Sequence, residues 1–183
     1  MNLVGGTDSN NRIKGETGMR NVLIGFGGND KLYGKDQDDV IIGGDGHDRL
    51  YGYDGSDLIS GGEGHDVING GGGNDGISGG TGHDRMWAGS GNDWVEGGAG
   101  NDRIYGQAGA DRLDGGSGND KIYGGADDDI ILGGSGHDKL YGEDGIDLMS
   151  GGVGNDYMNA GAGDDTAFGG DGNDYITGGW GND

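Results

Sequence analysis

Hydrophobic and polar positions follow a pattern that repeats every nine residues along most of the chain. Between Gly25 and Thr177 the sequence divides into seventeen consecutive nonapeptides with no insertion or deletion. The last three positions of each nonapeptide, such as Lys121-Ile122-Tyr123, predict a short strand whose side chains point out, in and out. The six positions before them are rich in Gly, which adopts positive φ angles without steric cost, so they predict a wide turn.

The eighth position supplies the side chains of the predicted core. It is apolar in all seventeen nonapeptides, although Ala167 contributes very little apolar surface. The series continues upstream through Leu23, Ile13 and Leu3, at intervals of ten residues. The core positions are Leu32, Ile41, Leu50, Ile59, Ile68, Ile77, Met86, Val95, Ile104, Leu113, Ile122, Ile131, Leu140, Met149, Met158, Ala167 and Ile176.

The regular alternation of strand and turn predicts a solenoid, because one nonapeptide is too small to bury its own apolar residue. Two strands and two turns make one coil of eighteen residues, and stacked coils place alternate strands in two parallel sheets that face each other. The predicted fold is therefore all-β: a parallel β-roll, that is, a two-sheet right-handed solenoid. We expect irregular N-terminal capping turns over 1–24, the nonapeptide roll over 25–177 and a partial repeat over 178–183.

The sixth position is the candidate metal-binding position, because the same acidic residue fills it throughout. Asp occupies it in all seventeen nonapeptides and in the partial repeat. Residues eighteen apart, such as Asp30 and Asp48, are expected to stack on one edge of the roll, where bare carboxylates roughly 5 Å apart repel one another. Ordinary turns do not require Asp at every ninth residue. The candidate metal ligands are Asp30, Asp39, Asp48, Asp57, Asp66, Asp75, Asp84, Asp93, Asp102, Asp111, Asp120, Asp129, Asp138, Asp147, Asp156, Asp165, Asp174 and Asp183.

The composition makes an apolar core alone insufficient for folding. Only 30% of the 183 residues are hydrophobic, 52 are Gly, and the formal net charge is −22. Burial of one Ile or Leu contributes about 2 kcal/mol, whereas ordering nine residues costs roughly 1 kcal/mol or more for each. Cys is absent, which excludes disulfides and thiolate metal sites. The remaining stabiliser is a cation with oxygen ligands, so we expect folding and ion uptake to be coupled.

The nonapeptides resemble the RTX (repeats-in-toxin) motif GGxGxDxUx, in which U is a large apolar residue; GGSGNDKIY at 115–123 is one example. The resemblance covers about four-fifths of the chain. It implies that Ca²⁺ lies between turns n and n+2, held by Asp side chains and turn carbonyls. It also implies a non-catalytic, secreted module of an extracellular bacterial protein, exported unfolded by type I secretion and folded by the calcium outside the cell.

Calcium suits these predicted sites better than magnesium, because Ca²⁺ accepts six to eight carboxylate and carbonyl oxygens in flexible geometry. Asp pairs eighteen residues apart number eight on each edge, so up to about sixteen ions are expected. Two turns depart from the motif, since Gln37 and Asp127 replace the Gly at the fourth position. The predicted sites beside Asp39 and Asp129 are therefore less well defined.

Several functions are not expected from this sequence. The negative charge disfavours nucleic acid, which is itself a polyanion. No apolar run is long enough to span a membrane, and Met1–Asn10 lacks the apolar core of a signal peptide. The stretch 76–80 matches the G-x-S-x-G elbow of hydrolases, but Ser78 falls inside a predicted strand without the helix that an elbow requires. The chain is not expected to be an enzyme, although it fits the non-catalytic part of a larger secreted one.

The variable positions leave a second interpretation open. One sheet would expose a cationic row beside an aromatic row. This arrangement is typical of an adhesion or carbohydrate-binding module, in which the aromatic rings stack on the sugars of cell-surface glycans. The alternative is that aromatic residues simply favour strands and that Lys and Arg balance the acidic edges. A monomer or an end-to-end assembly is expected. The two rows are Lys31, Arg49, Arg85, Arg103, Lys121 and Lys139, and Tyr33, Tyr51, Trp87, Tyr105, Tyr123 and Tyr141.

The four His residues all occupy the fifth position of alternate nonapeptides. His47, His65 and His83 are eighteen residues apart and are expected to stack, while His137 lies further along the same edge. A transition-metal site or a pH switch is one interpretation. Exposed turn filling is the other, since Asn holds the same position in neighbouring coils.

Overall fold

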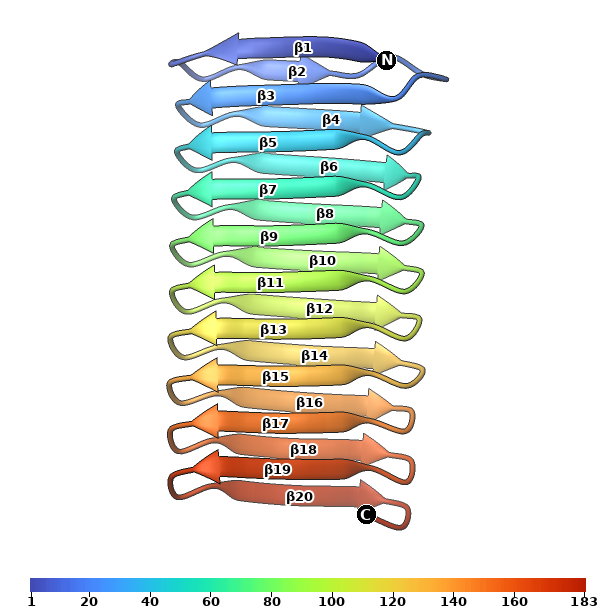
Figure 1. Ribbon diagram of the computed structural model, residues 1–183, viewed down its shortest axis with the longest axis vertical. Coiled ribbons are helices and arrows are strands. Elements are labelled where there is room, and N and C mark those ends of the chain that lie inside the picture. Colours follow the sequence, from blue (N-terminus) through green and yellow to red (C-terminus); the bar gives the residue numbers. More distant parts are fainter.

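The computed structural model describes all 183 residues, and the chain consists only of strands and turns (Figure 1). The strands of one sheet are β1 (Asn2–Thr7), β3 (Asn21–Gly27), β5 (Val40–Asp45), β7 (Leu58–Glu63), β9 (Gly76–Thr81), β11 (Trp94–Ala99), β13 (Arg112–Ser117), β15 (Ile130–Ser135), β17 (Leu148–Val153) and β19 (Thr166–Asp171). The strands of the other are β2 (Arg12–Lys14), β4 (Lys31–Lys35), β6 (Arg49–Asp54), β8 (Val67–Gly72), β10 (Arg85–Ser90), β12 (Arg103–Ala108), β14 (Lys121–Ala126), β16 (Lys139–Asp144), β18 (Tyr157–Ala162) and β20 (Tyr175–Trp180).

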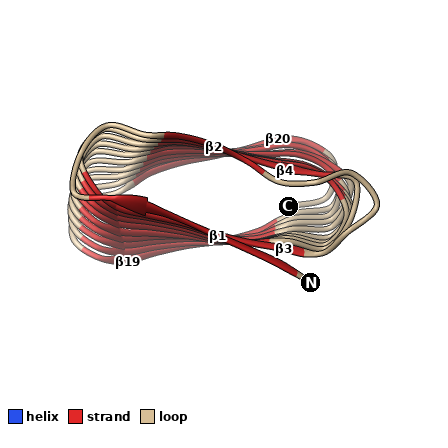
Figure 2. Cartoon of the chain, turned by 90° about the horizontal axis from the view of Figure 1, so that it is seen from above, coloured by secondary structure: helices blue, strands red, loops and turns tan.

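The two sheets contain ten strands each, and all neighbouring strands within a sheet are parallel. Pairing follows the nonapeptide period: Arg85 lies opposite Arg103, which lies opposite Lys121, so each coil takes up eighteen residues. Seen along the axis, the coils superpose as a flattened ring with one sheet on each long side and turns at both ends (Figure 2). The predicted all-β, two-sheet parallel solenoid is confirmed. The structure contains no helix that is long and apolar enough to cross a bilayer.

The N-terminal residues form the first coil of the same two sheets. Asn2 of β1 pairs with Asn21 of β3, and Arg12 of β2 pairs with Lys31 of β4, so this coil is one residue longer than the others. Asn21 stands where later coils carry Asp, and its Oδ1 accepts a hydrogen bond from the backbone N–H of Glu16 (2.8 Å). The division into a capping segment, a roll and a partial repeat stays a prediction.

The strands are longer than the three-residue strands expected from the sequence. A typical strand such as β12 runs through positions seven to nine and then through the first three positions of the next nonapeptide. The Gly at position one occupies an inward-facing position of the strand and so continues the alternation. Because Gly has no side chain, the neighbouring coil can approach closely there. The predicted six-residue turn was therefore too wide, because backbone pairing persists through the Gly-Gly pair.

The core is a single row of side chains on each sheet, facing the row on the other sheet. The eighth-position residues from Leu32 to Met158 are buried, as predicted, and the upstream residues Ile13 and Leu23 extend the row. Ala167 is only partly buried against it, and Ile176 in the last strand is 44% exposed. Each coil thus buries two large apolar side chains, which is a small core for eighteen residues.

Positive φ angles recur at the second and fourth positions of the turns, and Gly fills most of them. Gly46 illustrates the constraint: its φ is 129°, and an added Cβ would overlap the carbonyl of Gly28 in the preceding coil. Of the two irregular turns, the one with Asp127 keeps this conformation (φ 79°). The turn with Gln37 does not adopt a positive φ there, and the Gln37 side chain donates a hydrogen bond to the Asp36 carbonyl (2.6 Å) instead.

Candidate metal centres

The sixth-position Asp residues line the inner side of the turns at both edges of the roll. Sixteen of the eighteen, from Asp30 to Asp165, have buried side chains with exposures of 1–5%. Asp174 is half-buried and Asp183 is exposed, because both belong to the last coil and have no later coil beside them. The repeat therefore takes an acidic side chain into the interior once every nine residues, a place that carboxylates rarely occupy without a partner.

One oxygen of each carboxylate ties its coil to the preceding coil. The backbone N–H of each Asp donates to Oδ1 of the Asp eighteen residues later, at 2.7–2.9 Å for every donor from Asp30 to Asp156. Asn11 and Asn21 begin the two ladders by donating to Asp30 and Asp39. Asp at this position is thus structural as well as acidic, because its side chain accepts a hydrogen bond from an otherwise unpaired backbone donor.

The other oxygen, Oδ2, has no partner. In all sixteen buried Asp residues this atom is shielded from solvent and receives no hydrogen bond. In fourteen of these sixteen nonapeptides it lies beside the first-position Gly of its own nonapeptide and the first-position carbonyl oxygen of the next coil. The other two nonapeptides begin with Ala88 and Ala160. A Cβ added to Gly97, for instance, would lie 2.7 Å from Oδ2 of Asp102 and 2.5 Å from the carbonyl oxygen of Gly115. Acceptor oxygens from two coils converge there, so the point attracts a proton or a cation.

Burial raises the pKa of twelve of these carboxyl groups above the ordinary Asp value, and loss of hydration is the largest cause. The hydrogen bond from the preceding coil lowers the pKa in part, whereas in most cases a neighbouring carboxylate raises it further. The pKa rises to about 7 for Asp57, Asp66, Asp75, Asp111, Asp120 and Asp129, and to about 6 for Asp93, Asp102, Asp138 and Asp147.

The oxygen atoms that meet in the turns fit a hard cation, which prefers oxygen ligands. No group of three or more His, Cys, Asp or Glu side chains lies close enough together to hold a metal, so an ion in a turn would be bound by Asp oxygens and backbone carbonyls. Ca²⁺ accepts that mixture, whereas Zn²⁺ and other transition metals favour His and Cys ligands. The unpartnered Oδ2 atoms provide negative charge where carbonyl oxygens also converge. The residues present therefore fit calcium.

The fifth-position residues form a second ladder outside the first, which the sequence only partly revealed. His47, His65 and His83 stack as expected, with ring centroids 4.9 Å apart. Each imidazole also accepts a hydrogen bond at Nδ1 from the backbone N–H of the next coil, for example from His83 to His65 (2.7 Å). Asn101 and Asn119 accept the same bond at Oδ1. The sequence signal for this ladder is the interchange of His and Asn at the fifth position, since both side chains place a hydrogen-bond acceptor at a similar distance from the backbone.

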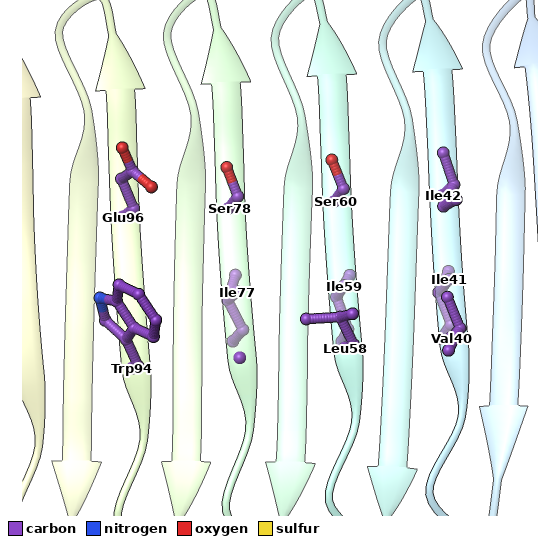
Figure 3. A pocket seen from close by; sticks show the side chains of 11 residues that line it. Val40, Ile41, Ile42, Leu58, Ile59, Ser60, Ile77, Ser78, Trp94 and Glu96 are labelled. Carbon is purple, nitrogen blue, oxygen red and sulfur yellow. The ribbon is translucent and has the colours of Figure 1, made fainter.

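An apolar hollow of about 310 Å³ lies on the outer face of the odd-numbered sheet (Figure 3). It forms where Gly76 has no side chain between Leu58 on β7 and Trp94 on β11. Ser78, the centre of the incidental G-x-S-x-G match, lies on β9 beside this hollow. Ser78 lies within the strand, and the next element is another strand rather than a helix, so Ser78 does not sit on a hydrolase elbow.

Taken together, the fold and the turns define a parallel β-solenoid whose two edges carry inward-facing carboxylates and converging carbonyls. Comparison with protein families extends this assignment: the model of the RTX calcium-binding nonapeptide repeat matches residues 5–41, 24–59, 51–86, 87–122, 114–149 and 150–183. The chain belongs to this family, which confirms the resemblance drawn from its nonapeptides and implies calcium binding. No curated protein matched the chain.

Proposed function

We propose that this chain is a non-catalytic structural module that folds when Ca²⁺ binds between successive turns. The observation that carries the proposal is the row of sixteen buried Oδ2 atoms without hydrogen-bond partners. A carboxylate in this position is stable only when a cation or a proton compensates its charge. Family membership supports calcium as the cation, and the sixth-position Asp residues from Asp30 to Asp183 are the proposed ligands.

Each residue type in a turn has a separate task in this proposal. The Asp side chain uses Oδ1 to fix the preceding coil and directs Oδ2 toward the proposed site. The first-position Gly, present in fifteen of the seventeen nonapeptides, leaves the space beside Oδ2 open, whereas Ala88 and Ala160 place a methyl group at that position. When bound, Ca²⁺ supplies the positive charge that the acidic edges lack. The small apolar core then needs only to complete the packing.

The proposed setting is an extracellular bacterial protein exported by type I secretion. Family membership and chemistry support it: calcium sites of extracellular modules are typically weak, with dissociation constants on the order of 10⁻⁴–10⁻³ M. Such sites stay empty at cytosolic calcium levels and fill outside the cell. The absence of Cys is compatible with the cytosol and with the extracellular space. Because no disulfide can form, calcium is the proposed stabiliser of the folded chain.

Substitution of one buried Asp provides the test. Asp102→Asn keeps an oxygen that accepts the backbone N–H of Asp84 but removes the charge at Oδ2. Asp102 stands between Asp84 and Asp120 on one edge, so it takes part in two successive gaps between coils. We expect the variant to bind one or two fewer calcium ions per chain, measured by isothermal titration calorimetry and native mass spectrometry.

The matched control is Asp144→Asn, which removes the same charge from an exposed position at the end of β16. Its calcium stoichiometry is expected to equal that of the unmodified chain. An unchanged ion count in Asp102→Asn, with the fold preserved in circular dichroism, would show that the buried carboxylates do not hold the metal.

A further inference from the structure

The even-numbered sheet carries a row of cations with no counter-charge. Arg85, Arg103, Lys121 and Lys139 lie directly opposite one another on the neighbouring strands β10, β12, β14 and β16. Strands are about 4.8 Å apart, and like charges directly opposite each other are destabilising. The only ion pair in the structure joins Arg20 to Asp38, so none of these four cations has a carboxylate within ion-pair distance. A chain with 33 acidic residues thus leaves its longest cationic row without a carboxylate partner, although Lys121 Nζ lies 4.9 Å from the centroid of the Tyr123 ring.

A polar groove of about 410 Å³ runs beside this row. Arg85, Arg103 and Lys121 form one wall, and the fifth-position ladder forms the other. The buried carboxylates of Asp66, Asp84 and Asp102 lie beneath it, where their oxygens are engaged with the preceding coil or shielded from solvent. The groove therefore exposes cations and ladder side chains rather than acidic oxygens. The ladder residues are His65, His83, Asn101 and Asn119.

The ladder wall presents hydrogen-bond donors to the groove. Nδ1 of His65 and of His83 accepts a backbone N–H, so the proton of each neutral imidazole is on Nε2. Oδ1 of Asn101 accepts the backbone N–H of Asn119, which leaves the Nδ2 amide group of Asn101 for other partners. Donors on one wall and cations on the other complement a ligand that carries anionic acceptor oxygens.

We propose that this groove binds a linear acidic polysaccharide whose chain runs along the axis of the roll. The groove repeats its donors and cations once per coil, which matches a polymer that repeats its carboxylates along an extended chain. The groove exists only in the folded roll, so the inference rests on calcium-dependent folding. Calcium between the underlying Asp residues would also remove the negative field below the groove.

The neighbouring aromatic row favours a sugar polymer over a nucleic acid. Trp87, Tyr105, Tyr123 and Tyr141 stack on one another with centroids 4.8–5.5 Å apart and planes within 13° of parallel. The rings of Tyr105 and Tyr123 are covered on both faces by neighbouring rings, so the row lacks the series of open ring faces on which single-stranded nucleic acids stack their bases. The covered faces also contradict the expectation that these rings stack on sugars. The phenol hydroxyl groups of the Tyr residues in this row can instead form hydrogen bonds with a saccharide.

The test measures binding of tetragalacturonate, which is too short to gel with calcium, to the full chain in excess calcium. We expect saturable binding that weakens as salt is added, and we expect the double variant Arg85→Gln/Arg103→Gln to weaken it by about tenfold or more. The control is Arg12→Gln/Arg112→Gln, which removes two charges outside the groove and should leave the affinity unchanged. Circular dichroism of every protein in the same buffer separates loss of binding from failure to fold.

The groove variant also has a readout that does not depend on the ligand. Because it relieves unpaired like charges, its melting temperature in calcium is expected to equal or exceed that of the unmodified chain. The proposal is overturned if folded chains bind tetragalacturonate equally with and without Arg85 and Arg103, if uncharged dextran fragments bind as tightly, or if a short oligothymidylate of equal charge binds more tightly. Failure of the chain to fold in calcium would instead refute the proposed function.

Discussion

Removal of calcium at neutral pH is expected to unfold the roll. The reason is electrostatic: six buried carboxyl groups have a pKa of about 7 in the folded chain without metal, against 3.8 for an unperturbed Asp. At neutral pH each of these raised pKa values lowers the free energy of unfolding by about 4 kcal/mol. Because domains are stable by only about 5–15 kcal/mol in total, a few such groups exceed what the narrow core can offset.

Far-UV circular dichroism during titration with EDTA provides the measurement. The β-sheet signal should disappear when calcium is chelated and return when calcium is restored in excess. Magnesium at the same concentration should restore much less, because it prefers a smaller octahedral shell that retains water. A chain that keeps its β signal in EDTA at neutral pH would contradict coupled folding and ion uptake.

Acid is expected to replace calcium as the stabiliser of the roll. In each of these Asp residues folding raises the pKa, so protons bind more tightly to the folded chain than to the unfolded chain. The resulting stabilisation is complete below about pH 4 and is lost as the pH rises through about 6 to 7, where the folded carboxyl groups ionise. A protonated Oδ2 also becomes a donor beside the converging carbonyl oxygens, such as that of Gly115 near Asp102.

The experiment is a pH titration in EDTA, followed by circular dichroism. We expect β structure near pH 4 and its loss as the pH rises through about 6 to 7. The transition should be steep, because many carboxyl groups titrate together. The sequence pI is about 4.1, so sedimentation must accompany the titration to separate folding from association at low net charge. A metal-free chain that remains unfolded at every pH while monomeric would show that protons do not replace the ion. It would also mean that neutralising Oδ2 is not sufficient for folding.

The period of nine determined most of the fold in advance. A strict repeat fixes which residues stack, so the two sheets, the core row from Leu32 to Met158 and the Asp ladders were predictable from spacing. The atoms that meet between coils were not predictable, because they depend on the rotation of each side chain and on where the backbone turns. The unequal roles of Oδ1 and Oδ2 in Asp102 and the strand that continues through Gly106 belong to this second group.

The variable positions were harder to interpret than the repeat. His65 and His83 appeared as turn filling or as a metal site, whereas their Nδ1 atoms close a hydrogen-bonded ladder. Tyr105 and Tyr123 appeared as a sugar-stacking surface, whereas strand spacing brings their rings face to face, 4.9 Å apart. In both cases the sequence placed the residues correctly in a row. The contacts within each row follow from the separation of neighbouring coils, which a sequence pattern does not express.

The location of calcium in the folded roll tests the central claim most directly. Crystals grown in calcium, with diffraction data collected at a long wavelength, show Ca²⁺ by its anomalous scattering. We predict peaks along both edges of the roll, each about 2.3–2.6 Å from Oδ2 of a sixth-position Asp and from backbone carbonyl oxygens. A folded roll with no anomalous peak beside Asp84, Asp102 and Asp120 would contradict the account.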